Sequence, residues 1–453
     1  MSTAPGQTPE QIVKAVAAGM PGVRKDLEEL VRIPGIAFDG YDFGPLERSA
    51  QAVARLFREA GVANARVERI GDGHPAVIGR RPAPPGAPTV LLYAHHDVQP
   101  IGEPSLWDSD PFEPVERDGR LYGRGAADDK AGVMAHVAAL RALGGEPPVG
   151  VAVFVEGEEE YSTTSLEPLL RKHRDELAPD VVVVADSANW AVGRPALTTS
   201  LRGTVSTLVE VRTAEHAVHS GIFGGAAPDA LTSLCRLLAT LHDAAGEPAI
   251  AGLVRGEPAP LDYPPERFRA EASLLDSVSL IGTGPIGSRL WTRPAIAVLG
   301  IDAPSIANAP NALTPVARAK VSMRLAPGDD TKRAFALLRE HLLRNAPWGA
   351  QVTVTLRGAG EPWAVHADGW AFTAARAAFT RAWDGVEPVD MGMGGSIPVV
   401  NVLTRLYPEA TILVTGVEDP HSRAHGANES LHLGEFARVC TAEALLLSSL
   451  ASR

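Results

Sequence analysis

The chain has 453 residues, of which 45% are hydrophobic and 21% charged, as in an ordinary globular protein, so wholesale disorder and a fibrous repeat are excluded. Its 42 lysines and arginines stand against 54 aspartates and glutamates, a net charge of −12 with no basic block, which argues against nucleic acid or an anionic membrane as a partner. Because single hydrophobic cores stop growing near about 250 to 300 residues, we expect at least two domains.

Two further features bear on the cellular compartment. Only Cys235 and Cys440 occur, too few for a disulfide framework or a Cys-rich zinc site, so we expect two buried apolar residues in a reducing compartment. The segment "MSTAPGQTPEQIVKAVAAGM" lacks the basic and apolar regions of a secretory signal. No apolar run approaches the ~20 residues that span a bilayer. We therefore expect a cytoplasmic protein.

In chain order, the first predicted element is a helix over 45–60, whose apolar residues recur at helical spacing and which Gly61 follows at a capping position. Short, β-branched, nearly continuous apolar runs are typical of strands covered on both faces, and they occur at 87–94, 149–156, 180–186 and 410–416. Helical patterns occur at 130–143, 165–173, 368–383 and 433–450. This alternation predicts an α/β domain with a mostly parallel central sheet flanked by helices.

The middle of the chain has a different pattern. The segments "TVSTLVEVRT", "ARAKVSMRLAP" and "QVTVTLRG" alternate polar with apolar residues, as half-exposed strands do, and helical patterns lie at 228–242 and 330–345. Pro- and Gly-bearing joints bracket this region. We predict an α+β domain at 200–357 inserted into a first domain made of 1–199 and 358–453.

Acidic and imidazole side chains follow each predicted strand of the α/β part. Ligands bind beyond the carboxyl ends of the strands in open α/β sheets, so these side chains are candidates for one shared cleft. In chain order they are His95, His96 and Asp97, then Asp128 and Asp129 ahead of a helix, Glu158, Glu159 and Glu160, Asp186, and the loop "EDPHSRAHGANE" with His421 and His425.

Each of these groups has a simpler interpretation when it stands alone. A His-x-Asp group is commonly a hydrogen-bonded structural histidine, a glutamate run is usually a solvated face, and an aspartate pair can cap a helix. Their coincidence favours a metal site, because crowded carboxylates repel one another unless cations lie between them. Mixed histidine and carboxylate ligands suit zinc, manganese or cobalt better than calcium or magnesium. Two ions about 3.5–4 Å apart would activate a bridging water and polarise a substrate carbonyl.

Several motifs together resemble a known family. In order they are "YAHHDVQP", "GRGAADDKAG", "EGEEE", "VVADS", "VHSGIFGG", "MRLAPGDD", "GGSIPVV" and "HGANES". The set resembles the co-catalytic di-zinc peptidases that include carnosinase, cytosolic nonspecific dipeptidase, aminoacylase and acetylornithine deacetylase, and it is most similar to their dipeptidase branch. The resemblance runs from about residue 20 to about residue 445. It implies a catalytic di-metal domain and an inserted lid and dimerisation domain.

The resemblance also implies roles for residues of the catalytic domain. Two divalent ions per subunit, zinc or else manganese or cobalt, would be held by His95 and Asp186, by Glu160 and His425, and by a bridging Asp128. Asp97 would orient the imidazole of His95. Glu159 would be the general base that activates the metal-bridging water and later protonates the leaving amine. His421 is a spare candidate ligand, but the context of His425 matches the family better.

For the inserted domain the resemblance implies contacts with substrate and with a second subunit. His219 would reach the active site of the partner in a homodimer and stabilise the tetrahedral oxyanion; without the resemblance it is a loop histidine. Arg324 would clamp the terminal carboxylate of the substrate through bidentate hydrogen bonds, the alternative being a half-exposed strand arginine without a ligand. Gly394, Gly395 and Ser396 would contact the same end of the substrate.

The sequence departs from the family pattern at three places. Ala94 stands where glycine is usual, His96 where an aromatic or small residue is frequent, and "EEEYST" where a Gly-Ser pair commonly follows the carboxylates, so that Tyr161 could alter the wall of the pocket. None of these departures removes a proposed ligand or the base. They bear on the choice of substrate.

The sequence thus predicts a cytoplasmic, homodimeric metallohydrolase that cleaves the amide bond of dipeptides or short peptides with a free C-terminal carboxylate. An N-acyl-amino-acid deacylase or related amidohydrolase of the same fold is the alternative, because the sequence does not show which residues would meet a free amino group. A catalytically silent metal- or peptide-binding protein would have lost a ligand or the base, and neither is lost. The sequence argues against a serine hydrolase, since "GGS" at 394–396 is followed by Ile and no G-x-S-x-G elbow follows a strand.

Overall fold

The computed structural model of the chain describes residues 7–161, 164–259 and 261–451. The chain divides into two compact units. The first extends to Thr199 and also contains His366–Met391 and the residues from Pro398 on, and the second contains Ser200–Val365 and Gly392–Ile397. Their assignment as catalytic and lid domains stays a prediction. None of the described helices is long and apolar enough to cross a membrane.

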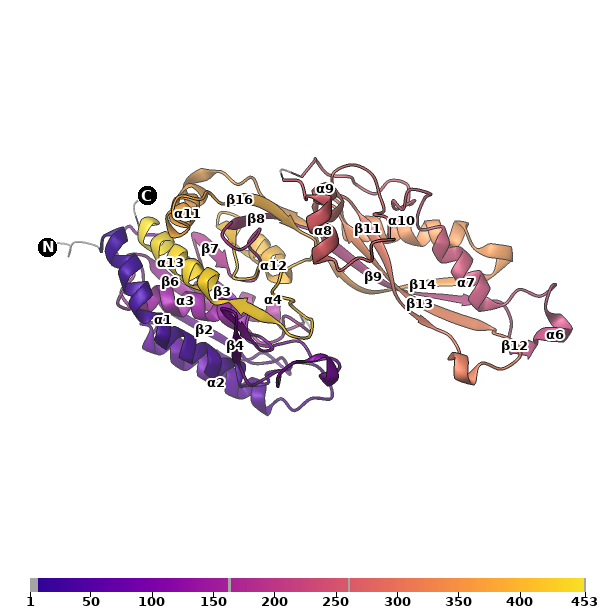
Figure 1. The fold of residues 1–453 in the computed structure, drawn as a ribbon, viewed down its shortest axis with the longest axis horizontal. Coiled ribbons are helices and arrows are strands. Elements are labelled where there is room, and N and C mark those ends of the chain that lie inside the picture. Colours follow the sequence, from indigo (N-terminus) through magenta and orange to yellow (C-terminus); the bar gives the residue numbers. More distant parts are fainter. Residues whose placement is uncertain (1–6, 162–163, 260, 452–453) are drawn as a thin grey trace. The chain divides into compact units, whose positions relative to one another are not determined.

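The first unit is built on a sheet whose four central strands are parallel, as predicted (Figure 1). These strands are, in sheet order, β6 (Gly150–Glu156), β3 (Thr89–His95), β7 (Val181–Val184) and β17 (Thr411–Val414). Every residue of β3, β6 and β7 is buried, which explains their continuous apolar sequences. The strands that flank this centre are β2 (Ala76–Arg81), β1 (Arg66–Glu68), β8 (Ala196–Leu201) and β16 (Val389–Met393). β15 (Trp363–Ala364) pairs with the last residues of β8 and belongs to the second unit.

Helices cover both faces of this sheet. The chain passes from β3 through α3 (Lys130–Ala142) to β6, and from β6 through α4 (Leu166–Lys172) and α5 (Arg174–Leu177) to β7 on the other side of β3. Because such crossovers are right-handed, α3 lies on one face of the sheet and α4 and α5 lie on the other. Helices α1 (Pro9–Val31) and α13 (Leu433–Ser449) pack with α3, and α11 (Gly369–Ala382) packs with α13. The remaining helices of this unit are α2 (Gly44–Glu59) and α12 (Pro398–Leu406).

Helix α1 was missed by the sequence pattern. It begins with a capping box between Thr8 and Gln11, and it buries Ile12, Val16, Val23, Leu27, Leu30 and Val31. Pro21 lies inside it with Gly22 beside it, and both residue types count against a helix in local propensity. The packing of α1 against α3 and α13 overrides that preference.

A small sheet joins two distant loops of the first unit. Its antiparallel strands are β18 (Ser430–His432), β5 (Arg120–Tyr122) and β4 (Val115–Arg117), in that order. β5 precedes the segment that carries Asp128, and β18 follows the loop that carries His425. The pairing of β5 with β18 therefore holds these two segments of the chain side by side.

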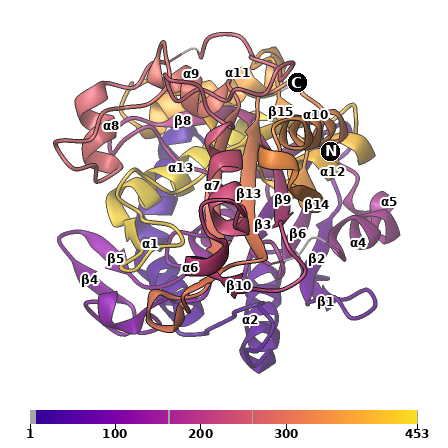
Figure 2. The same cartoon turned by 90° about the vertical axis from the view of Figure 1, so that its right-hand side faces the viewer.

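The second unit contains a four-stranded antiparallel sheet with one helical layer (Figure 2). The strand order is β11 (Ala295–Asp302), β13 (Val316–Leu325), β9 (Gly203–Arg212) and β14 (Gln351–Gly360). Helices α7 (Ala230–Ala239) and α10 (Thr331–Arg344) pack on one face through a common apolar core. The smaller elements of this unit are β10 (Val218–His219), β12 (Ala312–Leu313), α6 (Ser220–Phe223), α8 (Pro265–Glu271), α9 (Ile286–Trp291) and the 3-10 turns Ile306–Asn308 and Pro347–Gly349. The 3-10 turn Pro104–Leu106 belongs to the first unit.

The two cysteines do not share one environment. Cys440 is buried in α13, as expected, but the expectation of burial is wrong for Cys235, which is exposed on α7. Leu234, Leu237 and Leu238 supply the buried face of that short helix, so its amphipathic spacing leaves position 235 toward solvent.

Candidate metal centre

The candidate metal centre lies beyond the carboxyl ends of the central parallel strands. β3 ends at His95 and lies between β6, which leads to Glu159 and Glu160, and β7, which leads to Asp186. The crossover from β3 leads to β6 on one side, and the next crossover runs from β6 back past β3 to β7 on the other side, so the direction along the sheet reverses here. Such a switch point opens a crevice at the strand ends, where open α/β sheets bind ligands.

The shortest contacts in the cluster are made by Asp128, which lies between two imidazoles. Its Oδ1 is 3.0 Å from Nε2 of His95, and its Oδ2 is 3.1 Å from Nε2 of His425. The same nitrogen of His425 is 3.2 Å from Oε2 of Glu160. Each oxygen of one carboxylate thus faces a different potential ligand nitrogen, which is the arrangement that a bridging carboxylate requires.

Two groups of side chains in the described part of the chain have donor atoms close enough to hold an ion. One group is His95, Asp128 and Glu160, and the other is His95, Glu159 and Asp186; within each group the donor atoms lie within 4.8 Å of one another. All are nitrogen or oxygen donors, which suits zinc and its first-row neighbours. The second group contains Glu159, so the geometry also permits that residue in a ligand position.

Burial raises the pKa values of Asp186, Glu159 and Glu160, whereas for Asp128 the hydrogen bonds with His425 and His95 outweigh burial and lower the pKa. For Asp186 burial and then the charge of Asp128 raise the pKa to about 7. Burial raises the pKa of Glu159 well above its usual value, and the negative charge of Asp186 adds to that shift. The pKa of Glu160 is raised by burial and by Asp128. The carboxylates repel one another, so the cluster favours cations.

The imidazoles carry the opposite shift. Hydrogen bonds with Asp128 and Glu160 raise the pKa of His425 to about 11. Burial lowers the pKa of His95, but hydrogen bonds with Asp128 and Asp97 outweigh it and leave the pKa well above its usual value. In the absence of metal, the protonated imidazoles of His95 and His425 therefore supply the positive charge that balances the carboxylates. The donor set fits divalent ions, which would replace these protons.

Asp97 holds the backbone of the two glutamates. Its Oδ1 accepts the N–H of Glu159 at 3.3 Å and its Oδ2 accepts that of Glu160 at 3.1 Å. Nδ1 of His95 is 3.4 Å from Oδ1 of Asp97 and 3.1 Å from its backbone oxygen. Asp97 therefore touches the imidazole of His95 on the side away from Asp128 and also positions both glutamates.

Other acidic residues of the predicted cleft serve local structure. Glu158 is turned away and accepts the N–H groups of Ser165 at 2.9 Å and His74 at 3.3 Å. Asp129 occupies the N-cap position of α3 without a side-chain cap, and its Oδ2 accepts the N–H of His95 at 3.1 Å. It therefore supports the ligand strand instead of capping the helix.

His421 and the described positions that depart from the family pattern belong to neither group of potential metal ligands. His421 lines a surface cavity. His96 is buried, with Nε2 at 2.8 Å from the carbonyl of Pro75, and burial lowers its pKa to about 4. The hydroxyl of Tyr161 donates to Asp39 at 2.6 Å. Ala94 is buried in β3; Ser162 and Thr163 of "EEEYST" lie outside the described residues.

Two residues near the cluster escaped the sequence interpretation. Gln99 donates from Nε2 to Oε2 of Glu160 at 2.7 Å and so fixes that carboxylate. The carboxyl of Glu418 has a pKa raised well above its usual value by burial and by Asp128 and Asp186. Glu418 is the first residue of the loop "EDPHSRAHGANE", which the sequence marked as a candidate without giving this residue a role, whereas nothing in the local sequence marks Gln99.

The remaining predicted residues belong to the second unit. His219 ends β10 and is exposed, with Nδ1 accepting the N–H of Gly221 at 3.0 Å. Arg324 lies on the half-exposed face of β13, opposite Thr204 of β9, and burial lowers its pKa. Gly394 and Gly395 form a bend that Ser396 follows, and the carbonyl of Gly394 accepts from Nε of Arg202 at 3.3 Å.

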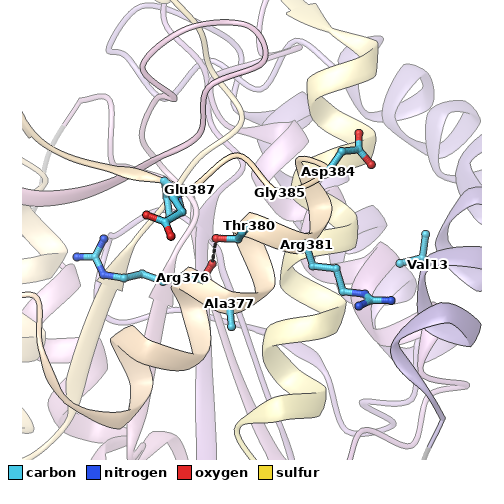
Figure 3. A pocket seen from close by; sticks show the side chains of 9 residues that line it. Val13, Arg376, Ala377, Thr380, Arg381, Asp384, Gly385 and Glu387 are labelled. Atoms are coloured by element: carbon cyan, nitrogen blue, oxygen red, sulfur yellow. Dashed lines mark hydrogen bonds between the residues drawn. The ribbon is translucent and has the colours of Figure 1, made fainter.

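A large hollow of about 820 Å³ on the first unit is not this centre (Figure 3). It lies along α11, and no predicted site residue lines it. Arg376 and Arg381, which line it, are paired with Asp390 and Glu10. The protein itself therefore compensates both of these guanidinium groups.

Comparisons with known proteins agree with this geometry. Residues 91–449 match the model of Peptidase family M20/M25/M40. A cysteinylglycine-S-conjugate dipeptidase of Corynebacterium striatum is 36% identical over 411 residues, covering 88% of this chain and 89% of that protein. A beta-Ala-His dipeptidase of Homo sapiens is 28% identical over 442 residues, covering 88% and 85%. The solved structure of the dipeptidase Dug1p from Saccharomyces cerevisiae shares the fold with a TM-score of 0.85 at 22% identity, covering 98% of this chain and 99% of that chain.

Proposed function

The chain belongs to Peptidase family M20/M25/M40, and from this membership we infer that it hydrolyses dipeptides or short peptides with a free C-terminal carboxylate in a metal-dependent reaction. The observation that carries the proposal is Asp128 between the imidazoles of His95 and His425, with Glu160 at 3.2 Å from the second imidazole. The dipeptidases among its relatives support the substrate class.

We assign two divalent ions, zinc in preference to manganese or cobalt, to this cluster. His95 and Asp186 would hold one ion, Glu160 and His425 the other, and Asp128 would bridge them. When bound, such a pair supplies Lewis-acid polarisation of the amide carbonyl and lowers the pKa of a water in the cleft. Asp97 and Gln99 would keep the ligands oriented through the contacts described above.

Glu159 would act as the general base. Its carboxylate lies beside His95 and Asp186, and its backbone N–H is held by Asp97. In this role it accepts a proton from the attacking water and returns the proton to the leaving amine. The raised pKa of its buried carboxyl favours both halves of that transfer, because it brings the pKa of the group closer to neutrality.

Recognition of the two ends of the substrate is assigned to different groups. Arg324 would bind the terminal carboxylate, with Ser396 and the backbone at Gly394 and Gly395 adding donors. Glu418 supports recognition of a free amino group, because it adds a further carboxylate to the field of Asp128 and Asp186. A protonated amine of the substrate beside these carboxyl groups would favour their charged forms and so be bound by them. This feature favours dipeptides over N-acyl amino acids.

The first experiment measures amine release by protein stripped of metal and then restored with zinc or manganese. Matched panels of dipeptides and of N-acyl amino acids would be compared. We expect metal-dependent cleavage of the free-amine dipeptides. Preference for acylated substrates would move the assignment to the deacylases, and no turnover on either panel with metal bound would overturn the hydrolase assignment.

We also propose a cytoplasmic homodimer in which His219 completes the active site of the partner subunit. His219 is exposed, and Ile222 and Phe223 beside it are 71% and 49% exposed, which supports an interface at this place. The test mixes two inactive variants, His219→Ala and Glu159→Gln, after subunit exchange. In a mixed dimer, one site has both native residues, so activity should return. A monomeric mass with full activity, or mixtures that stay inactive after demonstrated exchange, would refute the proposal.

A further inference from the structure

The second unit contains a cavity that the proposed peptidase function does not use. Its volume is about 430 Å³, within the range of small-molecule sites. All of its lining residues belong to Ser200–Val365. None of them is a proposed metal ligand, the proposed base or a proposed substrate contact. The cavity is therefore a separate candidate site.

Most of the lining is apolar. The larger apolar side chains are those of Phe268, Leu274, Leu280, Ile286, Leu290 and Ile296, contributed by α8, α9, β11 and the segment between the two helices. Such a lining favours a ligand with a hydrocarbon or aromatic body, since burying apolar surface from both sides is the main source of affinity in such a pocket.

Four arginines also line the cavity, and the protein itself satisfies three of them. Arg255 and Arg293 are paired with the single acidic lining residue, Glu247. Arg289 donates to the carbonyls of Ile281 and Gly284. These guanidinium groups are partly exposed, so water and carbonyl oxygens also satisfy them.

The fourth, Arg202, is different because it is buried. Only 8% of its surface is exposed, and it donates to two carbonyl oxygens, from Nε to Gly394 at 3.3 Å and from Nη1 to Arg289 at 3.2 Å. Within the described ranges of the chain it forms no ion pair with a carboxylate. Burial, together with the nearby charge of Arg324, lowers its pKa to about 10, so it stays charged at neutral pH.

A buried charge without a counter-ion is costly, and proteins usually pair it. Carbonyl dipoles compensate Arg202 only in part, and the cavity that it lines contains no free carboxylate of the protein. A guanidinium presents planar paired donors that match a carboxylate in geometry. We propose that this cavity binds an apolar monocarboxylate, whose carboxylate is the counter-ion of Arg202 and whose body fills the apolar lining.

Binding is tested on the full-length protein in chelator, so that coordination of a metal by the probe is excluded. The probe is 4-phenylbutanoate, compared by titration calorimetry with 4-phenylbutan-1-ol, which has the same body without the charge, and with acetate, which has the charge without the body. We expect one phenylbutanoate per chain, at least about tenfold weaker binding of the alcohol, and no measurable binding of acetate.

Variants assign the site. Arg202→Met should reduce the affinity for phenylbutanoate to that for the alcohol, whereas Arg202→Lys should retain part of the preference. Arg255→Met is the matched control, because Arg255 lines the same cavity but is paired with Glu247. Leu280→Trp keeps Arg202 and fills the cavity, so it should abolish binding of both probes without lowering the melting temperature.

The proposal is overturned if wild type binds phenylbutanoate no more tightly than the alcohol. It is also overturned if Arg324→Met abolishes binding while Arg202→Met does not, because the probe would then occupy the proposed subsite for the substrate carboxylate. Neither outcome depends on turnover, so a failure here is distinct from a failure of the peptidase assignment.

Discussion

Arg124 and Glu429 form a buried ion pair, with 2.6 Å between Nη1 and Oε2 and side-chain exposures of 1% and 0%. Oε1 of Glu429 also accepts the backbone N–H groups of Ala127 at 2.9 Å and Asp128 at 3.1 Å. One carboxylate therefore connects the loop that carries His425 with the segment that carries the candidate bridging ligand.

Glu429→Gln should lower the free energy of unfolding by about 3 kcal/mol, because it leaves the guanidinium of Arg124 buried without its counter-ion. Urea denaturation of metal-free protein measures the change. Glu113→Gln is the control, since Glu113 pairs with Arg32 at side-chain exposures of 60% and 43%, and exposed pairs contribute little. Equal effects of the two substitutions would contradict the structural role given to Glu429.

Glu159→Gln should reduce the turnover of dipeptides by about 10²-fold or more, because the amide cannot accept the proton of the attacking water. The metal content, measured by elemental analysis, should stay at the wild-type value. Glu158→Gln is the control and should retain most activity, since the Glu158 carboxylate binds backbone N–H groups outside the cluster. Loss of one ion in Glu159→Gln would instead make Glu159 a ligand of the group with His95 and Asp186.

Arg324→Met should lower kcat/KM for dipeptides by about 100-fold, mainly through KM, because charge-assisted hydrogen bonds to the terminal carboxylate are lost. The corresponding dipeptide amides should be cleaved equally well by variant and wild type. Arg318→Met is the matched control, because Arg318 lies on the same face of β13 and is paired with Glu210 at the surface. Parallel losses on free acids and amides would rule out a carboxylate subsite at Arg324.

His136 and Glu443 predict a dependence of stability on pH. The imidazole of His136 is hydrogen-bonded to the carboxylate of Glu443 at 2.6 Å and to the carbonyl of Tyr93 at 2.9 Å. Burial lowers the pKa of His136, but the charge of Glu443 and these hydrogen bonds outweigh burial and leave the pKa above its usual value. Because the folded pKa is raised, this stabilisation is fully present below about pH 6.5 and is lost as the pH rises through the folded value.

The measurement compares the urea unfolding of wild type and Glu443→Gln in chelator at pH 5.5, 7 and 8.5. The difference in free energy of unfolding should be largest at pH 5.5 and should shrink toward alkaline pH. Using the difference cancels the titration of groups that do not interact with Glu443. A difference that stays constant with pH would show that His136 is neutral throughout this range.

Gly416 follows β17 on the way to the loop of His425, and a Cβ there would lie 1.6 Å from the carbonyl oxygen of Ser187. Gly416→Ala should therefore lower the free energy of unfolding by at least about 3 kcal/mol. Gly22→Ala is the opposite case, since Gly22 lies inside α1 with nothing within 4 Å of a Cβ, and it should stabilise the protein by about 0.5–1 kcal/mol. Thermal and urea unfolding of the two variants should shift in opposite directions.

The sequence by itself determined the central sheet and the family. Apolar runs such as 87–94 and 149–156 correspond to β3 and β6, because a strand covered on both faces must be apolar throughout. Parallel strands also end at one edge of the sheet, so the acidic and histidine residues after each run were placed on that edge without coordinates.

Only the tertiary structure decided which of these side chains meet. Glu158 and Glu160 are close neighbours in one run, yet the first binds the backbone N–H of Ser165 and the second contacts His425, because no period relates sequence to side-chain direction in a loop. The partner of a buried charge is likewise set by packing between distant segments. Arg124 pairs with Glu429, which lies 305 residues further along the chain, whereas Arg202 pairs with no carboxylate of the described residues. The sequence around each arginine predicts neither outcome.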